Sequence, residues 1–368
     1  MFKWCRRQSL TGPDPDTMPD PASRAYPRRY VIDYVEETPY TAHAGDRAPA
    51  WRIWLALLVV YVVWGSTYLA IAVVVDTMPP LLSASVRHLI AGVLLFAVLA
   101  ARHGPGVIRL SRAELIGSAF VGLALLLGGN GLVMLAERDV PSGLTALIIA
   151  IVPLWVVLLR LAFGERVGRG TLLGVAVGFA GVAVLVVPDG LSGSGSLVGT
   201  LFLVLAGISW AFGSYYSRRL RLPANPFVST AAQLLLGGLG LAVAGVATGE
   251  ASLVEPARFS PESVLALGYL VVFGSLLGYT AYTWLLQATS VSKVATYAYV
   301  NPVVAIFLGW LVLNEQITAT IVVGGAMIVL SVGLVVRTES RPVASVAVMP
   351  ADVSPAEGRQ GLAEPADR

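Results

Sequence analysis

The side chains of this sequence that could contact a solute lie inside long apolar segments. Tyr297 and Asn301 are four residues apart, so a helix would present the phenol and the amide on one face. Trp64 and Tyr68 have the same spacing. A neutral amide and aromatic rings can hydrogen-bond and stack against a small neutral or zwitterionic solute. The pattern therefore predicts a binding face rather than a catalytic centre, with packing between helices as the alternative.

Other polar or aromatic residues at mid-depth are weaker candidates, because hydrogen bonding between helices is their more ordinary role. A proline inside an apolar segment frees a carbonyl one turn back and permits a kink, so it is predicted to gate movement. The predicted gating residues are Pro153 and Pro302. The predicted substrate-binding residues are Trp64, Ser66, Tyr68, Asn130, Trp155, Tyr279, Tyr297 and Asn301.

Two further residues, Arg87 and His88, bring a charge and a titrating group into an apolar segment. Arg87 would attract a carboxylate, but its long side chain also reaches outward to lipid headgroups or to Asp76, and we favour that second interpretation. His88 would titrate near neutrality in water, and a neutral contact between helices is its more ordinary role. No Asp or Glu is predicted deep in any segment, which disfavours a proton-driven pump and a cation exporter.

Apolar segments long enough to cross a bilayer carry all of these residues. The sequence is 56% hydrophobic and 13% charged, and its mean hydropathy is +0.75, unlike the composition of soluble domains. In hydrocarbon such segments satisfy their backbone amides only as helices. We therefore predict an all-α integral membrane protein of ten transmembrane helices, at 53–75, 82–101, 115–136, 142–163, 170–187, 197–217, 226–248, 263–286, 292–313 and 318–336.

An even number of spans places both chain ends on one side of the membrane, and the charges indicate which side. The face opposite the chain ends carries only Arg138 and Arg258, whereas Lys and Arg gather on the face of the chain ends. By the positive-inside rule, both termini are predicted in the cytoplasm. Residues 1–52 and 337–368 lack apolar periodicity and are predicted to be disordered cytoplasmic tails. The excess of Arg over Lys, with abundant Ala, Gly and Val, favours a bacterial cytoplasmic (plasma) membrane.

Sliding the sequence against itself by about 148 to 150 residues reveals an internal repeat. Residues 64–68 (WGSTY) then meet residues 212–216 (FGSYY), and Pro153 meets Pro302. Each half would hold five spans, and an odd number inserts the second half upside down. Such inverted repeats are typical of transporters, in which two similar halves exchange conformations and alternate access to a site between them.

Three stretches and a pair of turns carry a resemblance to a known family. WGSTYLA in the first span, PPLLSASVRHLIAG entering the second, ATYAYVNPVVA in the ninth, and the paired GER and NEQ turns resemble the EamA-domain drug/metabolite transporters, in particular the ten-helix drug/metabolite exporter group. The resemblance covers about residues 53–336. It implies two inverted five-helix repeats, at 53–187 and 197–336, and transport by alternating access. It does not identify the substrate, since relatives export amino acids, purines and other metabolites.

These observations together predict a secondary transporter that exports small neutral or zwitterionic metabolites, such as amino acids or related compounds. Its expected partners are the small-molecule substrate and the lipid bilayer. No nucleic acid is expected, because the basic residues flank helices. No cofactor or metal is predicted, and no phosphate-binding GxxxxGK[ST] loop occurs. The sequence also allows a homodimer through the small residues Gly170, Gly174 and Gly178, although packing within one chain is favoured.

Two other classes of protein remain as alternatives. An integral-membrane enzyme would need paired carboxylates, a metal set or an activated nucleophile at depth, and one buried His with no acid beside it is poor material. A membrane scaffold or sensor would act through its tails, and the tails of this sequence carry no folded pattern.

Overall fold

The computed structural model describes residues 49–186, 197–289, 291–294 and 296–339. The predicted tails lie outside the described residues, apart from 49–52 and 337–339. Every regular element of the described ranges is a helix. In chain order they are α1 (Ala50–Thr77), α2 (Pro80–His103), η2 (Pro105–Ile108), α3 (Arg112–Gly122), η3 (Leu123–Gly131), α4 (Leu132–Ala136), α5 (Ser142–Ile149), α6 (Val152–Ala162), α7 (Arg169–Val186), α8 (Leu197–Ser217), α9 (Pro226–Ala247), η4 (Glu250–Leu253), η5 (Pro256–Arg258), α10 (Pro261–Tyr269), η6 (Leu270–Tyr279), α11 (Thr280–Ala288), α12 (Val291–Val294), α13 (Tyr297–Leu313) and α14 (Ala319–Glu339).

The described helices confirm the predicted ten-helix membrane fold. Nine of them, counting continuous runs such as Arg112–Ala136 and Pro261–Leu286 as one, are long and apolar enough to cross a bilayer. The remaining predicted span is represented by the shorter apolar helix α13 (Tyr297–Leu313), with the short α12 before it. The predicted span 292–313 thus covers most of α12 (Val291–Val294) and all of α13.

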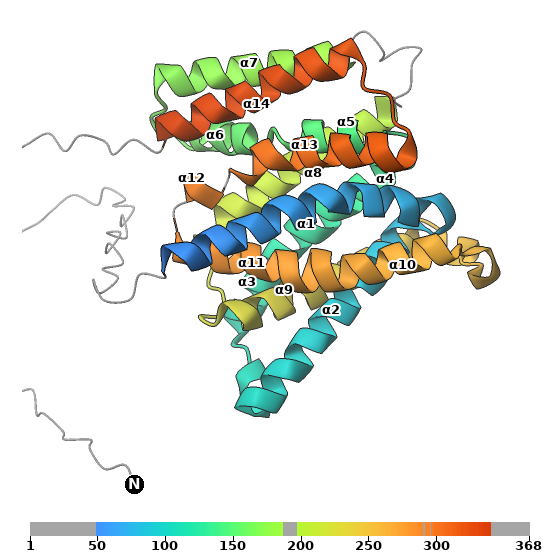
Figure 1. The fold of residues 1–368 in the computed structure, drawn as a ribbon. Coiled ribbons are helices and arrows are strands. Elements are labelled where there is room, and N and C mark those ends of the chain that lie inside the picture. Colours follow the sequence, from blue (N-terminus) through green and yellow to red (C-terminus); the bar gives the residue numbers. More distant parts are fainter. Residues whose placement is uncertain (1–48, 187–196, 290, 295, 340–368) are drawn as a thin grey trace, which may run out of the picture. The chain divides into compact units, whose positions relative to one another are not determined.

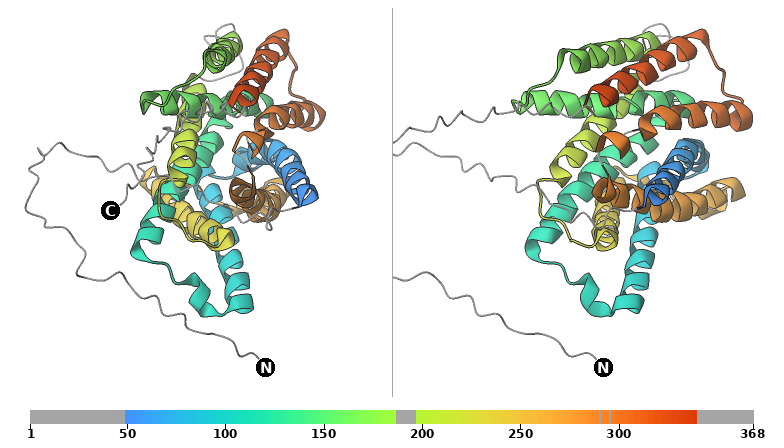
Figure 2. Two further views of the ribbon diagram at one scale, coloured as in Figure 1. Left: turned by 90° about the vertical axis from the view of Figure 1, so that its left-hand side faces the viewer. Right: turned by 60° about the vertical axis from the view of Figure 1, so that its left-hand side comes forward.

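Helices from the two halves pack in matched pairs (Figures 1 and 2). The fifth span, α7, lies along the tenth, α14. The second span, α2, packs on the seventh, α9. The first span, α1, packs on α13 and on α10–α11, while its counterpart α8 packs on α5–α6 and on η3–α4. These main contacts recur with the halves exchanged, as the internal repeat predicts.

The tight pairing of α7 with α14 uses the small residues that the sequence singled out. A Cβ added at Gly174 would lie 2.7 Å from a methyl of Val335, and a Cβ at Gly178 would lie 2.4 Å from Ser331 Oγ. Ser331 Oγ donates a hydrogen bond of 2.6 Å to the carbonyl of Gly174. These glycines therefore pack within one chain, as favoured, because only a missing side chain lets the backbones approach this closely.

Two π-helical segments occupy equivalent places in the halves. η3 interrupts the third span and η6 interrupts the eighth, so each helix carries wider turns near its middle. π-Helical turns are rare and recur at functional sites. The sequence analysis did not predict them, because a π-turn differs from an α-turn only in its hydrogen-bond partner and leaves the apolar pattern intact.

The two predicted gating prolines lie in different local structures. The fourth span is interrupted between α5 and α6 just before Pro153, whereas α13 runs unbroken through Pro302. Because α6 starts anew at Val152, Pro153 lies in its first turn. The N–H that proline lacks would have no hydrogen-bond partner within the helix at this position, so no helical hydrogen bond is lost.

Candidate functional site

A cavity of about 70 Å³ lies between the two halves. It is lined by side chains from α1, α2, η3, α4, α5, α6, α8, η6 and α13, and both π-helical segments contribute to it. Its lining residues are Trp64, Thr67, Tyr68, Ile71, Arg87, His88, Leu126, Gly129, Asn130, Val133, Ile149, Val152, Ala206, Trp210, Gly274, Ser275, Tyr279, Tyr297 and Asn301.

Four of the lining residues form a connected polar cluster, which comprises Arg87, His88, Asn130 and Ser275. Arg87 Nε donates to Ser275 Oγ at 2.8 Å, and Arg87 Nη1 donates to Asn130 Oδ1 at 3.5 Å. The ring of His88 lies 3.4 Å from Asn130 Oδ1 through Nε2 and 3.3 Å from Ser275 Oγ through Nδ1. The cluster thus joins α2 to both π-helical segments.

Arg87 does not reach the membrane surface. Only 4% of the residue is exposed, and its guanidinium lies in the cavity wall rather than at lipid headgroups or Asp76. The favoured prediction for Arg87 is therefore wrong, because α2 turns this residue toward η6, where Ser275 accepts its hydrogen bond. Attraction of a carboxylate by Arg87 stays a prediction.

An aromatic cluster forms another part of the cavity wall around Trp64. The ring centre of Trp64 lies 5.8 Å from that of Trp210 and 5.5 Å from that of Tyr297, both nearly perpendicular to it. Edge-to-face pairs of this kind are favourable aromatic contacts. Tyr282 packs behind, 4.8 Å from Trp64, without lining the cavity. The cluster draws one side chain from each of α1, α8, α11 and α13.

Glycines of η6 allow the two clusters to meet. A Cβ at Gly274 would lie 2.7 Å from Arg87 Nη2, and a Cβ at Gly278 would lie 2.6 Å from Trp64 Nε1. Trp64 Nε1 donates to the carbonyl of Gly274 at 3.3 Å. Any side chain at these positions would push Arg87 or Trp64 away from the η6 backbone, so both glycines position the cavity wall.

Asn301 lies at the boundary between α13 and α1. In the amide orientation that satisfies its hydrogen bonds, Asn301 Nδ2 donates to the carbonyl of Tyr297 at 3.1 Å and to that of Tyr61 at 3.2 Å. The residue is 4% exposed and also lines the cavity. Asn301 therefore ties two spans together at the same place where it faces the cavity.

Of the predicted residues, Trp64, Tyr68, Arg87, His88, Asn130, Tyr279, Tyr297 and Asn301 line the cavity, and Ser66, Pro153, Trp155 and Pro302 do not. Ser66 Oγ donates to the carbonyl of Val63 and lies 2.6 Å from the hydroxyl of Tyr269. Trp155 packs edge-on against Phe179 at 4.8 Å. Both side chains therefore contact neighbouring helices and are not part of the cavity wall.

The sequence analysis missed Thr67, Trp210 and Ser275 in the cavity wall. Thr67 and Ser275 are small polar residues in apolar runs, so nothing in their spacing marks them. Trp210 could have been predicted, because it lies two residues before Phe212, the residue that the repeat aligns with Trp64.

Equivalent positions in the two halves carry different chemistry. α2 and α9 both begin with a proline, and the position of Arg87 in α2 is occupied by Gln233 in α9. Gln233 is buried, accepts a hydrogen bond of 2.7 Å from the hydroxyl of Tyr279, and donates one of 2.9 Å to Ser229. The described lining thus contains one arginine and one histidine, and no Asp or Glu.

Carboxylates hold helix ends together at one end of the helices, which we call the Glu315 end. Glu315 accepts hydrogen bonds from the amides of Ser142 and Gly143 at 2.8 and 3.0 Å, and so caps α5. Glu250 caps α2 in the same way, accepting from the amides of Leu81 and Leu82 at 3.1 and 2.9 Å. Anions are stabilised at helix N-termini by free N–H groups and by the helix dipole.

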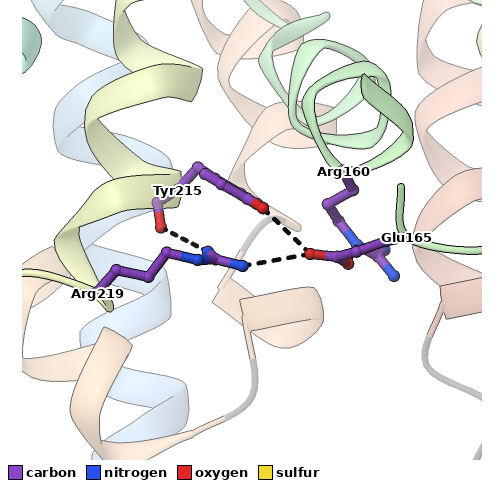
Figure 3. A network of polar contacts seen from close by, with 4 residues as sticks. All are labelled: Arg160, Glu165, Tyr215 and Arg219. Atoms are coloured by element: carbon purple, nitrogen blue, oxygen red, sulfur yellow. Dashed lines mark hydrogen bonds and ion pairs between the residues drawn. The ribbon is translucent and has the colours of Figure 1, made fainter. Parts of the chain in front are cut away.

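The opposite end, the Glu165 end, carries an ion-pair network (Figure 3). Glu165 pairs with Arg160 Nε at 2.7 Å and with Arg219 Nη2 at 3.3 Å, and it accepts from the hydroxyl of Tyr215 at 3.2 Å. The hydrogen bond from Arg160 is the main reason that the pKa of Glu165 lies below its ordinary value of 4.5. Glu165 and Glu315 each follow a residue with positive φ, Gly164 at 81° and Asn314 at 56°, a conformation that glycine and asparagine tolerate best.

Comparison with known proteins adds to this geometry. The sequence matches the EamA-like transporter family over residues 51–187 and 197–337. It is 40% identical over 256 residues, 69% of this chain and 80% of the relative, to the protein of Escherichia coli (strain K12) called "Uncharacterized inner membrane transporter YedA". It is 26% identical over 302 residues, 74% of this chain and 91% of the relative, to the "Probable amino-acid metabolite efflux pump" of the same strain. A solved crystal structure at 21% identity shares the fold, with a TM-score of 0.57 over 80% of this chain and 100% of the other.

Proposed function

Since the chain belongs to the EamA-like transporter family, we propose that it is a secondary transporter that exports small neutral or zwitterionic metabolites across the cytoplasmic membrane of a bacterium. The observation that carries this proposal is the cavity between the halves, because its wall combines aromatic and polar side chains within the apolar, membrane-spanning part of the protein. A protein of this family with a membrane-embedded, mixed cavity is equipped to hold a solute between two aqueous phases.

Alternating access is the proposed mechanism. The matched packing of α1 on α13 and of α8 on α5–α6 supports it, because exchanging the two arrangements would open the cavity to the other side. Pro153, at the break between α5 and α6, is the proposed hinge of the fourth span. Pro302 remains a proposed gating residue without such a break.

The proposed orientation puts both termini and the Glu165 end in the cytoplasm, and the Glu315 end outside. Arg102, Arg112, Arg169, Arg219 and Arg337 lie at helix ends on the Glu165 side, against Arg138 and Arg258 on the other. The positive-inside rule supports this choice. The repeat boundaries 53–187 and 197–336 and a possible homodimer are also part of the proposal.

Amino acids and related compounds are the proposed substrates. Two observations support them: the neutral amide and aromatic rings of the cavity, and the name of the efflux-pump relative. A membrane enzyme is a weaker proposal, since the polar cluster pairs a histidine with an arginine and an amide rather than with a carboxylate.

Counterflow in vesicles tests the proposed function. Purified protein is reconstituted into liposomes preloaded with a mixture of unlabelled amino acids, and uptake of each labelled amino acid is followed. We expect a transient accumulation above equilibrium for at least one of them, because a carrier exchanges solutes faster than it equilibrates them. Liposomes with the Gly274→Leu variant serve as the negative control, since a leucine side chain at this position would displace Arg87 from its place in the cavity wall. No accumulation for any amino acid would contradict the proposed substrate class.

A further inference from the structure

The polar cluster of the cavity contains a cation without an anion. Arg87 is 4% exposed, and its two hydrogen-bond acceptors, Ser275 and Asn130, are both neutral. Among the described residues, no carboxylate forms an ion pair with Arg87, and none lines the cavity. Removing a guanidinium from water without a counter-charge costs several kcal/mol, and neutral hydrogen bonds return only part of that cost.

The guanidinium also has unused capacity. It carries five N–H donors in one plane, and the contacts to Ser275 and Asn130 account for two of them. The Nη2 atom lies against the backbone of Gly274, where a side chain would collide with it. The missing side chain at Gly274 therefore leaves room for Nη2, and no hydrogen bond from Nη2 to the described residues is present.

A planar fork of donors matches a carboxylate better than any other common anion of metabolites. We infer that Arg87 binds the carboxylate of the transported solute, so that the substrates are organic carboxylates of the amino-acid type whose apolar part packs on Trp64, Trp210 and Tyr297. This inference rests on the proposed transport function and names the group that the cavity recognises. The buried cation is then paired whenever the site is loaded.

Neighbouring residues fit this role as positioning residues. Asn130 and Ser275 hold Arg87 from the two π-helical segments, and His88 contacts both of them. The guanidinium is thereby fixed before the solute arrives, which reduces the entropy lost on binding. Aromatic faces beside the polar cluster can also accept the ammonium group of a zwitterion.

A panel of matched solutes tests the inference by binding rather than transport. Leucine, leucinamide and 4-methylpentanoate share one apolar side chain, but leucinamide lacks the carboxylate and 4-methylpentanoate lacks the ammonium group. Each is titrated against the purified wild-type protein in detergent, and the apparent Kd is taken from the shift in Tm. We expect leucinamide to bind at least about tenfold more weakly than leucine, as hydrogen bonds to a charged group are worth about one to two decades.

The variants Arg87→Gln and Arg87→Lys then separate binding from folding. Arg87→Gln should bring the ratio of the leucine and leucinamide affinities close to one, and Arg87→Lys should restore part of it, because lysine keeps the charge but loses the fork. Arg102→Gln, at the exposed end of the same helix, is the matched control and should leave the ratio unchanged.

The outcomes distinguish this inference from the proposed function. Equal binding of leucine and leucinamide to the wild type, or an unchanged ratio in a folded Arg87→Gln variant, would overturn the role of Arg87 while leaving export in place. Discrimination in the wild type with counterflow absent would instead contradict transport. If Arg87→Gln does not fold, the wild-type panel and Arg87→Lys still decide the question. Preference for 4-methylpentanoate over leucine would support the carboxylate site and exclude recognition of the ammonium group.

Discussion

The contact between Glu315 and the start of α5 predicts how firmly the halves are joined at the Glu315 end. Glu315 follows α13, and its carboxylate accepts two backbone hydrogen bonds from Ser142 and Gly143. Hydrogen bonds to a charged group contribute about 1.5 to 3 kcal/mol each. Because Glu315 is partly exposed, we take the lower value for both, which gives about 3 kcal/mol. Glu315→Ala should therefore raise the open fraction at this end about a hundredfold.

Ser142 provides a reporter for this opening. Its side chain is fully buried beneath Glu315, and Ser142→Cys is nearly isosteric. The sequence has a single cysteine, Cys5, so Cys5→Ser gives a clean background. In detergent-purified protein, the rate at which a maleimide labels Cys at position 142 then follows the open fraction. We expect Glu315→Ala to raise that rate by about two decades.

Glu114→Ala is the matched control for this experiment. Glu114 accepts the amide of Ser111 at 2.8 Å and completes a capping box, but it joins no second span. Labelling at position 142 should not change in this variant. An unchanged labelling rate in Glu315→Ala would show that Glu315 does not hold the two halves together at this end. An equal rise in both variants would show a general loss of stability rather than a specific effect of the Glu315 contact.

Four further predictions follow from the ends and the cavity. Reporter fusions after Arg219 should score cytoplasmic and those after Glu250 external, and an external score after Arg219 would exclude the proposed orientation. Asn301→Leu should lower Tm by removing hydrogen bonds worth about 0.5 to 1.5 kcal/mol each, and should raise the half-saturation concentration about two- to tenfold only if the amide also contacts the solute. The pKa of Glu165 lies below 4.5, so its ionised carboxylate should stabilise the wild type relative to Glu165→Gln by a constant amount at neutral pH. This difference in stability should disappear as the pH falls through the lowered pKa, and equal acid sensitivity of the two proteins would be the contrary result. Burial and the nearby Glu315 raise the pKa of Glu137 well above its ordinary value of 4.5, so the wild type should lose stability relative to Glu137→Gln as the pH rises above 4.5; Tm measured against pH for both proteins checks this sign.

The membrane fold could be predicted from sequence because hydrocarbon leaves the backbone few options. Segment length and composition locate helices such as α9 (Pro226–Ala247) almost to the residue, and no long-range information is needed. The rotation of each helix is a different matter. Tyr297 and Asn301 were found because their spacing puts them on one face, which proved to be a cavity face.

The missed features depend on contacts between distant parts of the chain. Arg87 was expected to snorkel, but it donates a hydrogen bond to Ser275 on η6, which lies 188 residues away in the sequence. The cap of α5 by Glu315 joins residues far apart in sequence, so no local motif announces it. Trp155 was expected in the cavity, but it packs against Phe179 of α7, a contact that no local pattern indicates.

Arg87 in α2 and Gln233 in α9 occupy equivalent positions in the two halves. Because one is a cation and the other a neutral amide, the two halves give the cavity different surroundings. A carrier built from two identical halves would present the same surroundings to a solute on either side. Under the proposed alternating access, Arg87 of the described cavity lining would lie at a different place relative to each opening of the cavity. A bound solute would then keep one orientation but meet different walls on the two sides. The half-saturation concentrations measured from the two sides can therefore differ. Without an energy source, the ratio of maximal rate to half-saturation concentration must still be equal in the two directions for an uncharged or zwitterionic solute. Asymmetric kinetics can therefore arise in this protein from a single side chain, with no gradient coupled to it.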